Sequence, residues 1–132
     1  MGDKKEKSNI LIAYDSRTGN VEWLARQLGY PMKPVQEFNG EEVQEHIFLM
    51  THTFGRGSIT KATETFLNRY AGNTIGVCVS GDRRWGNLFG LAGDKIRLAY
   101  DIPLVRKIDV RGYPSDIEAV TGWLEQWKDN AE

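Results

Sequence analysis

The chain has 132 residues, a length typical of one domain and sufficient for a stable core without disulfide bonds. Its 17 Lys and Arg side chains nearly balance 18 Asp and Glu side chains, so the overall charge gives no attraction to nucleic acid or acidic membranes. No apolar run approaches the roughly 20 residues that span a bilayer. The single cysteine, Cys78, excludes an internal disulfide and suits a reducing compartment, so we expect a cytoplasmic protein.

The first residues are charged and contain no apolar segment, so they do not have the pattern of a secretory signal peptide. Gly2 is where a myristoyl group would be attached, but Glu6 stands where that motif needs Ser or Thr. We therefore expect residues 1–8 to be a disordered charged tail and residues 9–130 to form the domain.

Apolar runs alternate with amphipathic stretches, a pattern typical of β-α-β units with a parallel sheet. The pattern predicts strands at 9–14, 32–35, 46–51, 74–80 and 104–110, and helices at 21–28, 62–70, 88–99 and 115–127. Pro34 cannot donate a ladder hydrogen bond, so its strand is expected at a sheet edge. Ser115 and Glu118 have the spacing of a capping box. We expect a doubly wound five-stranded parallel sheet with helices on both faces.

The segment after the first strand, residues 15–20, has the composition of a phosphate-binding turn. A helix follows it, and a helix N-terminus has unpaired N–H groups and partial positive charge, which favour an anion. Ser16, Thr18 and Asn20 add neutral donors, and Gly19 lets the backbone close around the anion. No lysine follows the glycine, so the turn differs from a nucleotide P-loop. In an α/β chain this turn indicates the phosphate of flavin mononucleotide (FMN).

Two further segments, 51–57 and 80–87, follow inner strands of the expected sheet. Gly55 and Gly57 allow close approach to a flat ring, and a peptide there could turn toward N5 of a flavin; the alternative is an ordinary turn into a helix. The later segment offers backbone donors for the pyrimidine edge and an aromatic plane in Trp85. In doubly wound sheets, flavodoxins among them, ligands bind at the carboxyl ends of the strands where strand order reverses. We therefore expect the three segments to form one site.

The motifs of these segments resemble those of a known family. They are 14–21, 51–57 and 80–86, followed by Phe89 and the Ala-Gly-Asp of 92–94; residues 102–103 and 111–116 also fit. Over residues 9–127 the chain resembles the NrdI family, the small flavodoxin-like activators of class Ib ribonucleotide reductase. The motif at 80–86 distinguishes this family from ordinary flavodoxins.

The resemblance implies a flavodoxin-like FMN-binding domain that acts as an accessory activator rather than a stand-alone metabolic enzyme. Its reduced flavin would react with oxygen to give superoxide or a peroxide equivalent, used to assemble the metal-radical cofactor of the reductase. The implied partners are the radical (dimetal) subunit of that reductase and a flavin reductant or electron donor. Neither a metal site of its own nor binding to nucleic acid or membrane is expected.

The resemblance also assigns site residues, by motif. The residues that would hold the phosphate are Ser16, Arg17, Thr18, Gly19, Asn20 and Val21. The residues that would frame the ring are Thr51, Thr53, Phe54, Gly55, Ser80, Gly81, Asp82, Trp85 and Gly86. No catalytic side chain is implied, because the flavin itself supplies the chemistry.

The chain departs from the family pattern near the ring. His52 stands where the family usually has Tyr, and Phe54 where it has a small residue. Asp82 and Arg84 replace two asparagines, and residues 108–110 replace a Phe-Glu-Leu run. These departures leave the expected fold unchanged and bear on the redox potential of the flavin.

Three residues are candidates for tuning the ring: His52, Gly55 and Asp82. The charge of Asp82 would disfavour an anionic reduced flavin, whereas Arg56, Arg83 or a protonated His52 would favour it. A generic flavodoxin electron carrier is the alternative function. Carriers of this kind tend to be acidic around the flavin, and the arginines of the predicted mouth argue against it.

Two other classes fit less well. Cys78 and Arg84 match the C-x5-R spacing of tyrosine phosphatases, but Cys78 lies within an expected buried strand and Asp82 would repel a phosphate dianion. A response-regulator receiver would need clustered acidic residues after the first strand, and Asp15 stands there alone.

Overall fold

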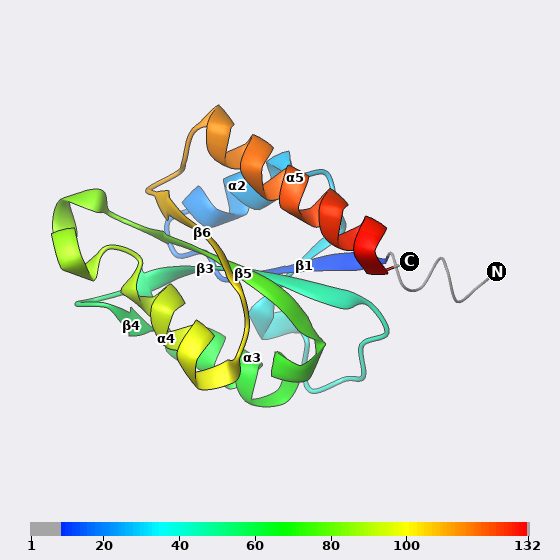
Figure 1. The fold of residues 1–132 in the computed structure, drawn as a ribbon. Coiled ribbons are helices and arrows are strands. Elements are labelled where there is room, and N and C mark those ends of the chain that lie inside the picture. The colour runs from blue at the N-terminus through cyan, green and yellow to red at the C-terminus, as the bar shows by residue number, and fades with distance from the viewer. Residues whose placement is uncertain (1–8, 132) are drawn as a thin grey trace.

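A parallel sheet with the strand order β2-β1-β3-β5-β6 forms the centre of the molecule (Figure 1). The computed structural model describes residues 9–131, so the predicted tail at 1–8 lies outside the described residues. The strands are β1 (Ile10–Tyr14), β2 (Met32–Pro34), β3 (His46–Phe54), β5 (Thr74–Gly81) and β6 (Leu104–Asp109). A two-residue strand, β4 (Ser58–Ile59), pairs antiparallel with β3. The predicted doubly wound five-stranded parallel sheet is confirmed.

Helices cover both faces of this sheet (Figure 1). Helices α2 (Asn20–Gln27) and α5 (Pro114–Ala131) pack on one face, and α3 (Lys61–Tyr70) and α4 (Leu91–Tyr100) on the other. Short 3-10 helices lie at Val35–Glu37 (η1), Ala71–Asn73 (η2) and Arg83–Leu88 (η3). Among residues 9–131, no helix has the length and apolar character needed to cross a membrane.

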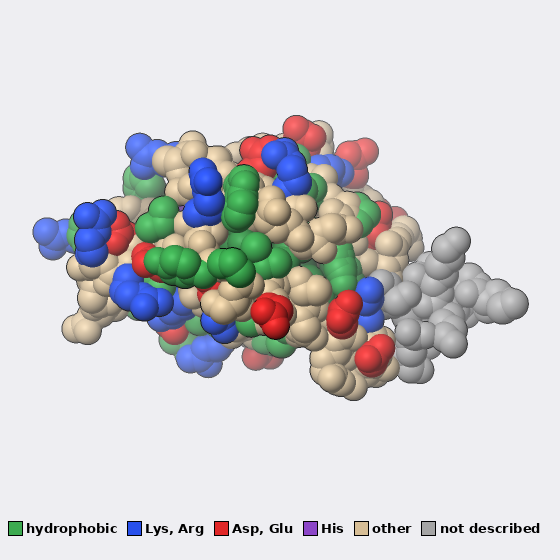
Figure 2. Space-filling model, turned by 90° about the horizontal axis from the view of Figure 1, so that it is seen from above, with side chains coloured by type: hydrophobic (Ala, Val, Ile, Leu, Met, Phe, Trp, Pro, Cys, Tyr) green, Lys and Arg blue, Asp and Glu red, His purple; other side chains and the backbone are tan. Residues whose placement is uncertain are grey.

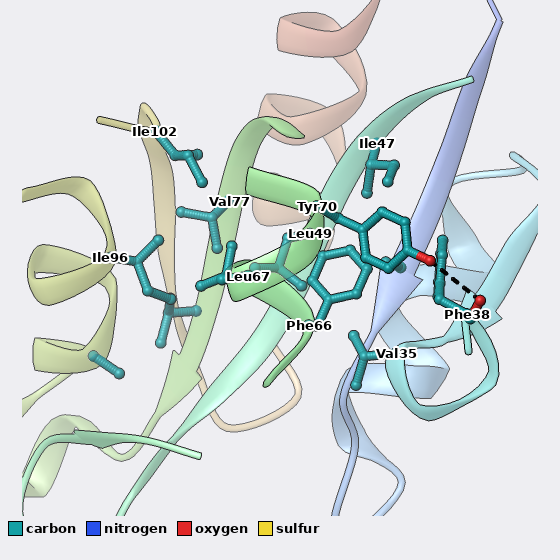
Figure 3. Close-up of a cluster of buried hydrophobic side chains, with 13 residues drawn as sticks. Val35, Phe38, Ile47, Leu49, Phe66, Leu67, Tyr70, Val77, Ile96 and Ile102 are labelled. Atoms are coloured by element: carbon teal, nitrogen blue, oxygen red, sulfur yellow. Dashed lines mark hydrogen bonds between the residues drawn. The ribbon is translucent and has the colours of Figure 1, made fainter. Parts of the chain in front are cut away.

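Two apolar cores, one on each face, hold the inner strands in place. The core under α3 contains an aromatic cluster in which the ring of Phe38 lies 4.9 Å from Phe66 and 5.2 Å from Tyr70 (Figure 3). The hydroxyl of Tyr70 donates to the carbonyl oxygens of Phe38 at 3.2 Å and Glu41 at 2.6 Å. The buried hydroxyl is thereby satisfied, and the loop before β3 is fixed to α3.

The third strand continues past its predicted end at Thr51, through Phe54. Thr51 and Thr53 are β-branched and suit an extended strand. Gly55 (φ 55°) and Gly57 (φ 108°) then adopt the left-handed conformations that turn the chain back into β4, and the Gly57 N–H donates to the Phe54 carbonyl at 3.3 Å. The predicted loop at 51–57 is therefore the end of a strand and a tight hairpin turn.

The edge position of β2 is confirmed, because β2 stands at the end of the strand order, is paired with β1 and ends at Pro34. The predicted start of the third helix is wrong: α4 begins at Leu91, after Gly90 in the left-handed conformation at φ 64°. Residues 83–88 form 3-10 turns that are broken at Gly86. A glycine with positive φ ends helical geometry, which explains the late start of α4.

The predicted capping box of the last helix is also wrong. Helix α5 begins at Pro114, whose fixed φ and missing N–H suit the first helical position. The carboxylate of Asp116 accepts a hydrogen bond from the Tyr113 N–H at 2.7 Å, so Asp116 caps the helix in place of the Ser115–Glu118 pair. The Asp116 carboxylate also accepts from Nε of Arg106 at 2.6 Å, which joins the helix start to β6.

Candidate functional site

The carboxyl ends of β1, β3 and β5 lie at one edge of the sheet, where the strand order reverses between β1 and β3. A cavity of about 230 Å³ opens at this edge. The residues that line it are Asn20, His52, Thr53, Gly55, Ser80, Gly81, Asp82, Trp85, Leu88, Gly90 and Val110. The structure thus brings residues from all three predicted segments together around one cavity.

Fewer side chains of the turn after β1 line this cavity than the sequence predicted. Of the six residues assigned to the phosphate, only Asn20 lines the cavity, while Ser16 and Arg17 line an adjoining cavity of about 360 Å³. Thr18 and Gly19 are exposed, whereas the Val21 side chain is 4% exposed and packs in the core. Val21 could therefore contact a phosphate at this turn only through its backbone, not through its side chain.

The hydroxyls of this turn stabilise the start of α2. Oγ of Ser16 accepts a hydrogen bond from the Glu22 N–H at 3.1 Å, and Oγ1 of Thr18 accepts from the Asn20 side-chain amide at 3.3 Å. Gly19 precedes the helix at φ 91°, a conformation open to glycine. The turn is therefore folded back on the helix N-terminus, where backbone N–H groups are left without helical partners.

The end of β3 contributes His52 and Thr53 to the cavity. Oγ1 of Thr53 is buried at the cavity and is the single buried side-chain polar atom of residues 9–131 that has no hydrogen-bond partner. Thr51 lies two residues earlier on the same face of the strand, deeper in the core, and its hydroxyl pairs with that of Thr63 at 2.7 Å. His52 lines both cavities, and the exposed ring of Phe54 lines only the adjoining one. Thr51 and Phe54 were predicted to frame the ring, and the structure places both outside the first cavity.

A buried carboxylate lies beneath this edge. Asp15 is 6% exposed and accepts hydrogen bonds from the hydroxyls of Thr60 and of Thr63, the latter at 2.9 Å. Nε2 of His52 lies 3.9 Å from the other carboxylate oxygen. Thr60 also caps α3 by accepting from the Thr63 N–H at 3.0 Å. Asp15 thus fastens the end of β1 to the start of α3, a role that its position in the turn did not indicate.

The segment after β5 is organised by aspartates. Asp82 accepts from the Arg84 backbone N–H at 3.0 Å and from Nη2 of the Arg84 side chain at 2.6 Å. These hydrogen bonds, the side-chain ones first, lower the pKa of Asp82 to about 2, so it is ionised at neutral pH. Its charge is offset by the neighbouring guanidinium. The Arg83 N–H donates to Asp109 at 3.0 Å, which ties this segment to β6.

Trp85 and Gly86 were both predicted to frame the ring, but only Trp85 lines the cavity. Trp85 lines the cavity and is 53% exposed, so it lies at the mouth. Gly86 is exposed at φ 60° and does not line the cavity. Its contribution is a backbone turn that no other residue type adopts readily.

Three cavity residues were missed in the sequence: Leu88, Gly90 and Val110. Leu88 and Gly90 stood inside the expected third helix, and the glycine was the available signal that this helix starts later. Val110 ends the stretch expected to form an outer strand, and a β-branched residue gives no sign of its observed left-handed conformation at φ 57°. Ser80, predicted to meet the ring, uses its hydroxyl to donate to the Val110 carbonyl.

Exposed cations and apolar groups surround the cavity. Lys and Arg side chains gather at the end of the molecule that carries the β5–α4 connection (Figure 2). The exposed arginines of the surrounding turns are Arg17, Arg56, Arg83, Arg84 and Arg111. Exposed apolar side chains at the same edge are Phe54, Trp85, Val110 and Tyr113. Apart from Asp82 and Asp109, both already hydrogen-bonded, these turns carry no exposed or half-buried carboxylate, so the rim is basic.

A model of the NrdI flavodoxin-like family matches residues 12–122. The chain belongs to this family. A Protein NrdI from Bacillus licheniformis is 35% identical over 118 residues, which cover 89% of this chain and 88% of the relative. NrdI from Deinococcus radiodurans is 32% identical over 124 residues (92% and 87%), and the phage protein NrdI of Bacillus phage SPbeta is 29% identical over 111 residues (83% and 86%). The resemblance to NrdI in the sequence motifs is confirmed.

The solved structures that superpose on this chain include flavodoxins. A short-chain flavodoxin associated with a bacterial microcompartment superposes with a TM-score of 0.75 at 19% identity, covering 93% of this chain and 98% of that one. Oxidised flavodoxin 2 of Bacillus cereus has a TM-score of 0.69 at 22% identity (92% and 99%). A Fusobacterium nucleatum flavodoxin bound to FMN has a TM-score of 0.62 at 15% identity (92% and 97%). At these identities the likeness establishes the flavodoxin-like fold of this NrdI family member.

The phosphatase-like spacing has no matching geometry in this NrdI family member. Cys78 is 1% exposed inside β5, and burial raises the pKa of its thiol, so the nucleophilic thiolate is disfavoured. Arg84 is engaged by Asp82 at the surface. A buried neutral thiol and a paired arginine do not form a phosphate-transfer site.

Proposed function

We propose that this chain is a cytoplasmic FMN-binding activator of a class Ib ribonucleotide reductase. Reduced FMN would supply electrons to oxygen, and the resulting superoxide or peroxide would assemble the metal-radical cofactor of the radical (dimetal) subunit. A separate flavin reductant or electron donor would restore the reduced form. The observation that carries the proposal is the Thr53 hydroxyl, a buried polar atom without a partner that lines a cavity at the sheet edge of a NrdI family fold.

The residues present fit a flavin phosphate and ring. An orphaned hydroxyl is costly in an empty site and is satisfied when a ligand offers an acceptor or donor. Asn20 would meet the phosphate end with the backbone of the turn after β1, while Gly81 and Asp82 would offer backbone groups to the polar edge of the ring. Trp85 at the mouth offers an aromatic plane.

The charges of the rim also fit an anionic cofactor. Arg17 on the first turn and Arg56 on the hairpin are exposed beside the two cavities, and neither has a salt-bridge partner within residues 9–131. Cations beside a bound flavin favour its anionic form. The Asp82 charge, offset by Arg84, opposes this less than an isolated carboxylate would.

Two ring-tuning roles belong to the proposal. Gly55 has φ 55°, lines the cavity and lies in a turn open to solvent at its Cβ position, and its peptide would turn toward the ring. His52 lies between the two cavities with its Nε2 near Asp15, where it could place a proton beside the flavin. Both roles concern the redox potential rather than the affinity of the cofactor.

A generic flavodoxin electron carrier is the second candidate, supported by the fold of the solved neighbours. The basic rim argues against it, because carriers of this type rely on acidic surfaces to steer docking. The two functions separate in one experiment: the FMN-loaded protein is reduced without oxygen, then mixed with oxygenated buffer and the metal-loaded radical subunit. We expect rapid oxygen consumption and a radical signal by electron paramagnetic resonance. Slow oxygen consumption without a radical would support the carrier.

Thr53→Val tests the proposed contact with the cofactor. Valine has nearly the same shape and removes the unpaired hydroxyl, so the protein without FMN should be as stable as wild type or more so. FMN should bind about tenfold more weakly, because a lost hydrogen bond to a buried partner costs about 1–3 kcal/mol. Fluorescence titration gives the affinity and thermal denaturation the stability. Unchanged affinity would remove Thr53 from the proposed site.

A further inference from the structure

The turn between β6 and α5 places a strained valine at the cavity. Val110 has φ 57°, in the left-handed region where a β-branched side chain crowds the backbone. The residue is 44% exposed and belongs to neither apolar core. Burial in the core therefore does not offset the strain, and glycine or asparagine would adopt the same conformation at lower cost.

Several contacts force this conformation. The Val110 N–H donates to the Gly81 carbonyl at 2.7 Å, and the hydroxyl of Ser80 donates to the Val110 carbonyl, so β5 holds both sides of the residue. The Gly112 N–H donates to the Asp109 carbonyl at 2.9 Å, which closes the turn. Strain of this kind persists only where the surrounding structure over-determines it, and such residues cluster at ligand sites.

The next residue fastens the same turn to a different element. The guanidinium of Arg111 lies over the indole of Trp23 on α2, 5.1 Å from the ring centroid. A cation over an indole face is attracted by the ring electrons. The turn is thus attached to both β5 and α2, the elements on either side of the cavity mouth, and Val110 lines the cavity beside Ser80, Gly81 and Asp82.

We propose that Val110 is a ring-contacting residue of the cofactor site, held by Ser80 and Gly81 so that its isopropyl group forms an apolar wall against the bound flavin. This inference rests on the proposed FMN binding and adds a fourth segment, the β6–α5 turn, to the three that the sequence motifs indicated. The favourable contact is made only when the ring is bound, whereas the strain is present in both states. The wall therefore increases affinity for the cofactor at a cost to the stability of the protein alone.

Val110→Asn separates these two effects. Asparagine tolerates the left-handed region and is close to valine in size, so the FMN-free variant should melt a few degrees higher than wild type. The substitution removes the apolar wall, so the dissociation constant for FMN should rise about tenfold, as expected for losing part of a buried valine contact. Val110→Ile keeps an apolar wall and the strain, and should bind FMN within about twofold of wild type.

Asp101 provides a matched control. It also has φ 57°, it ends α4 at an exposed position, and it lies outside the cavity. Asp101→Asn should leave FMN affinity unchanged. Ser80→Ala removes the hydroxyl that holds the Val110 carbonyl, and should weaken FMN binding while lowering the melting temperature of the FMN-free protein.

Each outcome bears on the proposal. Weaker FMN binding by Val110→Asn together with an equal or higher melting temperature supports it. Unchanged FMN affinity contradicts it, and so does an effect confined to binding of the radical subunit. In Val110→Asn, weaker binding accompanied by a lower melting temperature also contradicts it, because the loss would then reflect damage to the turn. If wild type itself does not bind FMN, the proposed function fails before this inference is reached.

Discussion

Gly57→Val is expected to lower the free energy of unfolding by about 3 kcal/mol or more. Gly57 is buried with φ 108°, which a valine adopts only under strain. A Cβ added there would lie 2.6 Å from Cδ2 and 3.0 Å from Cβ of Leu91, the first residue of α4. The Leu91 Cβ cannot move without its helix, so the hairpin and α4 must separate. Urea denaturation followed by circular dichroism measures the change.

Gly55→Val is the matched control in the same turn. Gly55 also has positive φ, at 55°, but no atom lies within 4 Å of an added Cβ. Its substitution should cost only the backbone strain, about 1–2 kcal/mol. It should also disturb the flavin more than the fold, because this residue lines the cavity. Equal destabilisation by the two substitutions would show that contact with α4 does not fix the hairpin.

Asp15→Ala is expected to lower the free energy of unfolding by about 2–4 kcal/mol. The substitution leaves the hydroxyls of Thr60 and Thr63 without their shared acceptor in a buried setting. A buried donor that loses its partner carries the cost of its desolvation, and the start of α3 loses its link to β1. The same denaturation experiment applies.

A double-mutant cycle isolates this network. Thr63→Val removes one of the two donors, so its effect and that of Asp15→Ala should combine to less than their sum. Asp101→Asn, at an exposed helix end, removes a carboxylate while keeping a residue type that tolerates φ 57°, so it serves as the control and should change stability little. Additive effects of Asp15→Ala and Thr63→Val would mean that the two side chains do not act together.

The periodicity of apolar residues was sufficient to predict the sheet and the helices on its two faces. Burial decides both the strand pattern and the helix pattern, so elements such as β1 and α3 are visible in the sequence. The placement of the turns at one edge also follows, because parallel strands end on the same side. Element ends were less predictable: the hairpin after Phe54 depends on pairing between β3 and β4, which local propensity does not encode.

The sequence predicted which segments meet at the cavity and where glycines turn the backbone there. Gly19 and Gly55 do adopt left-handed conformations. Side-chain partners come from elsewhere in the fold: Thr51 is engaged by Thr63, and Ser80 by Val110, 30 residues later. Such pairs are set by tertiary packing. Sequence motifs therefore indicated the three segments that meet at the cavity, and the structure was needed to distinguish residues that line the cavity from those that support it.

Titration of the purified, flavin-free protein with FMN, using riboflavin in parallel, tests the central claim most directly. Quenching of flavin fluorescence should show saturable binding of one FMN per chain, with riboflavin much weaker because it lacks the phosphate that the turn after β1 would hold. Absence of saturable FMN binding would contradict the account. Equal affinity for the two flavins would contradict the assignment of that turn to the phosphate.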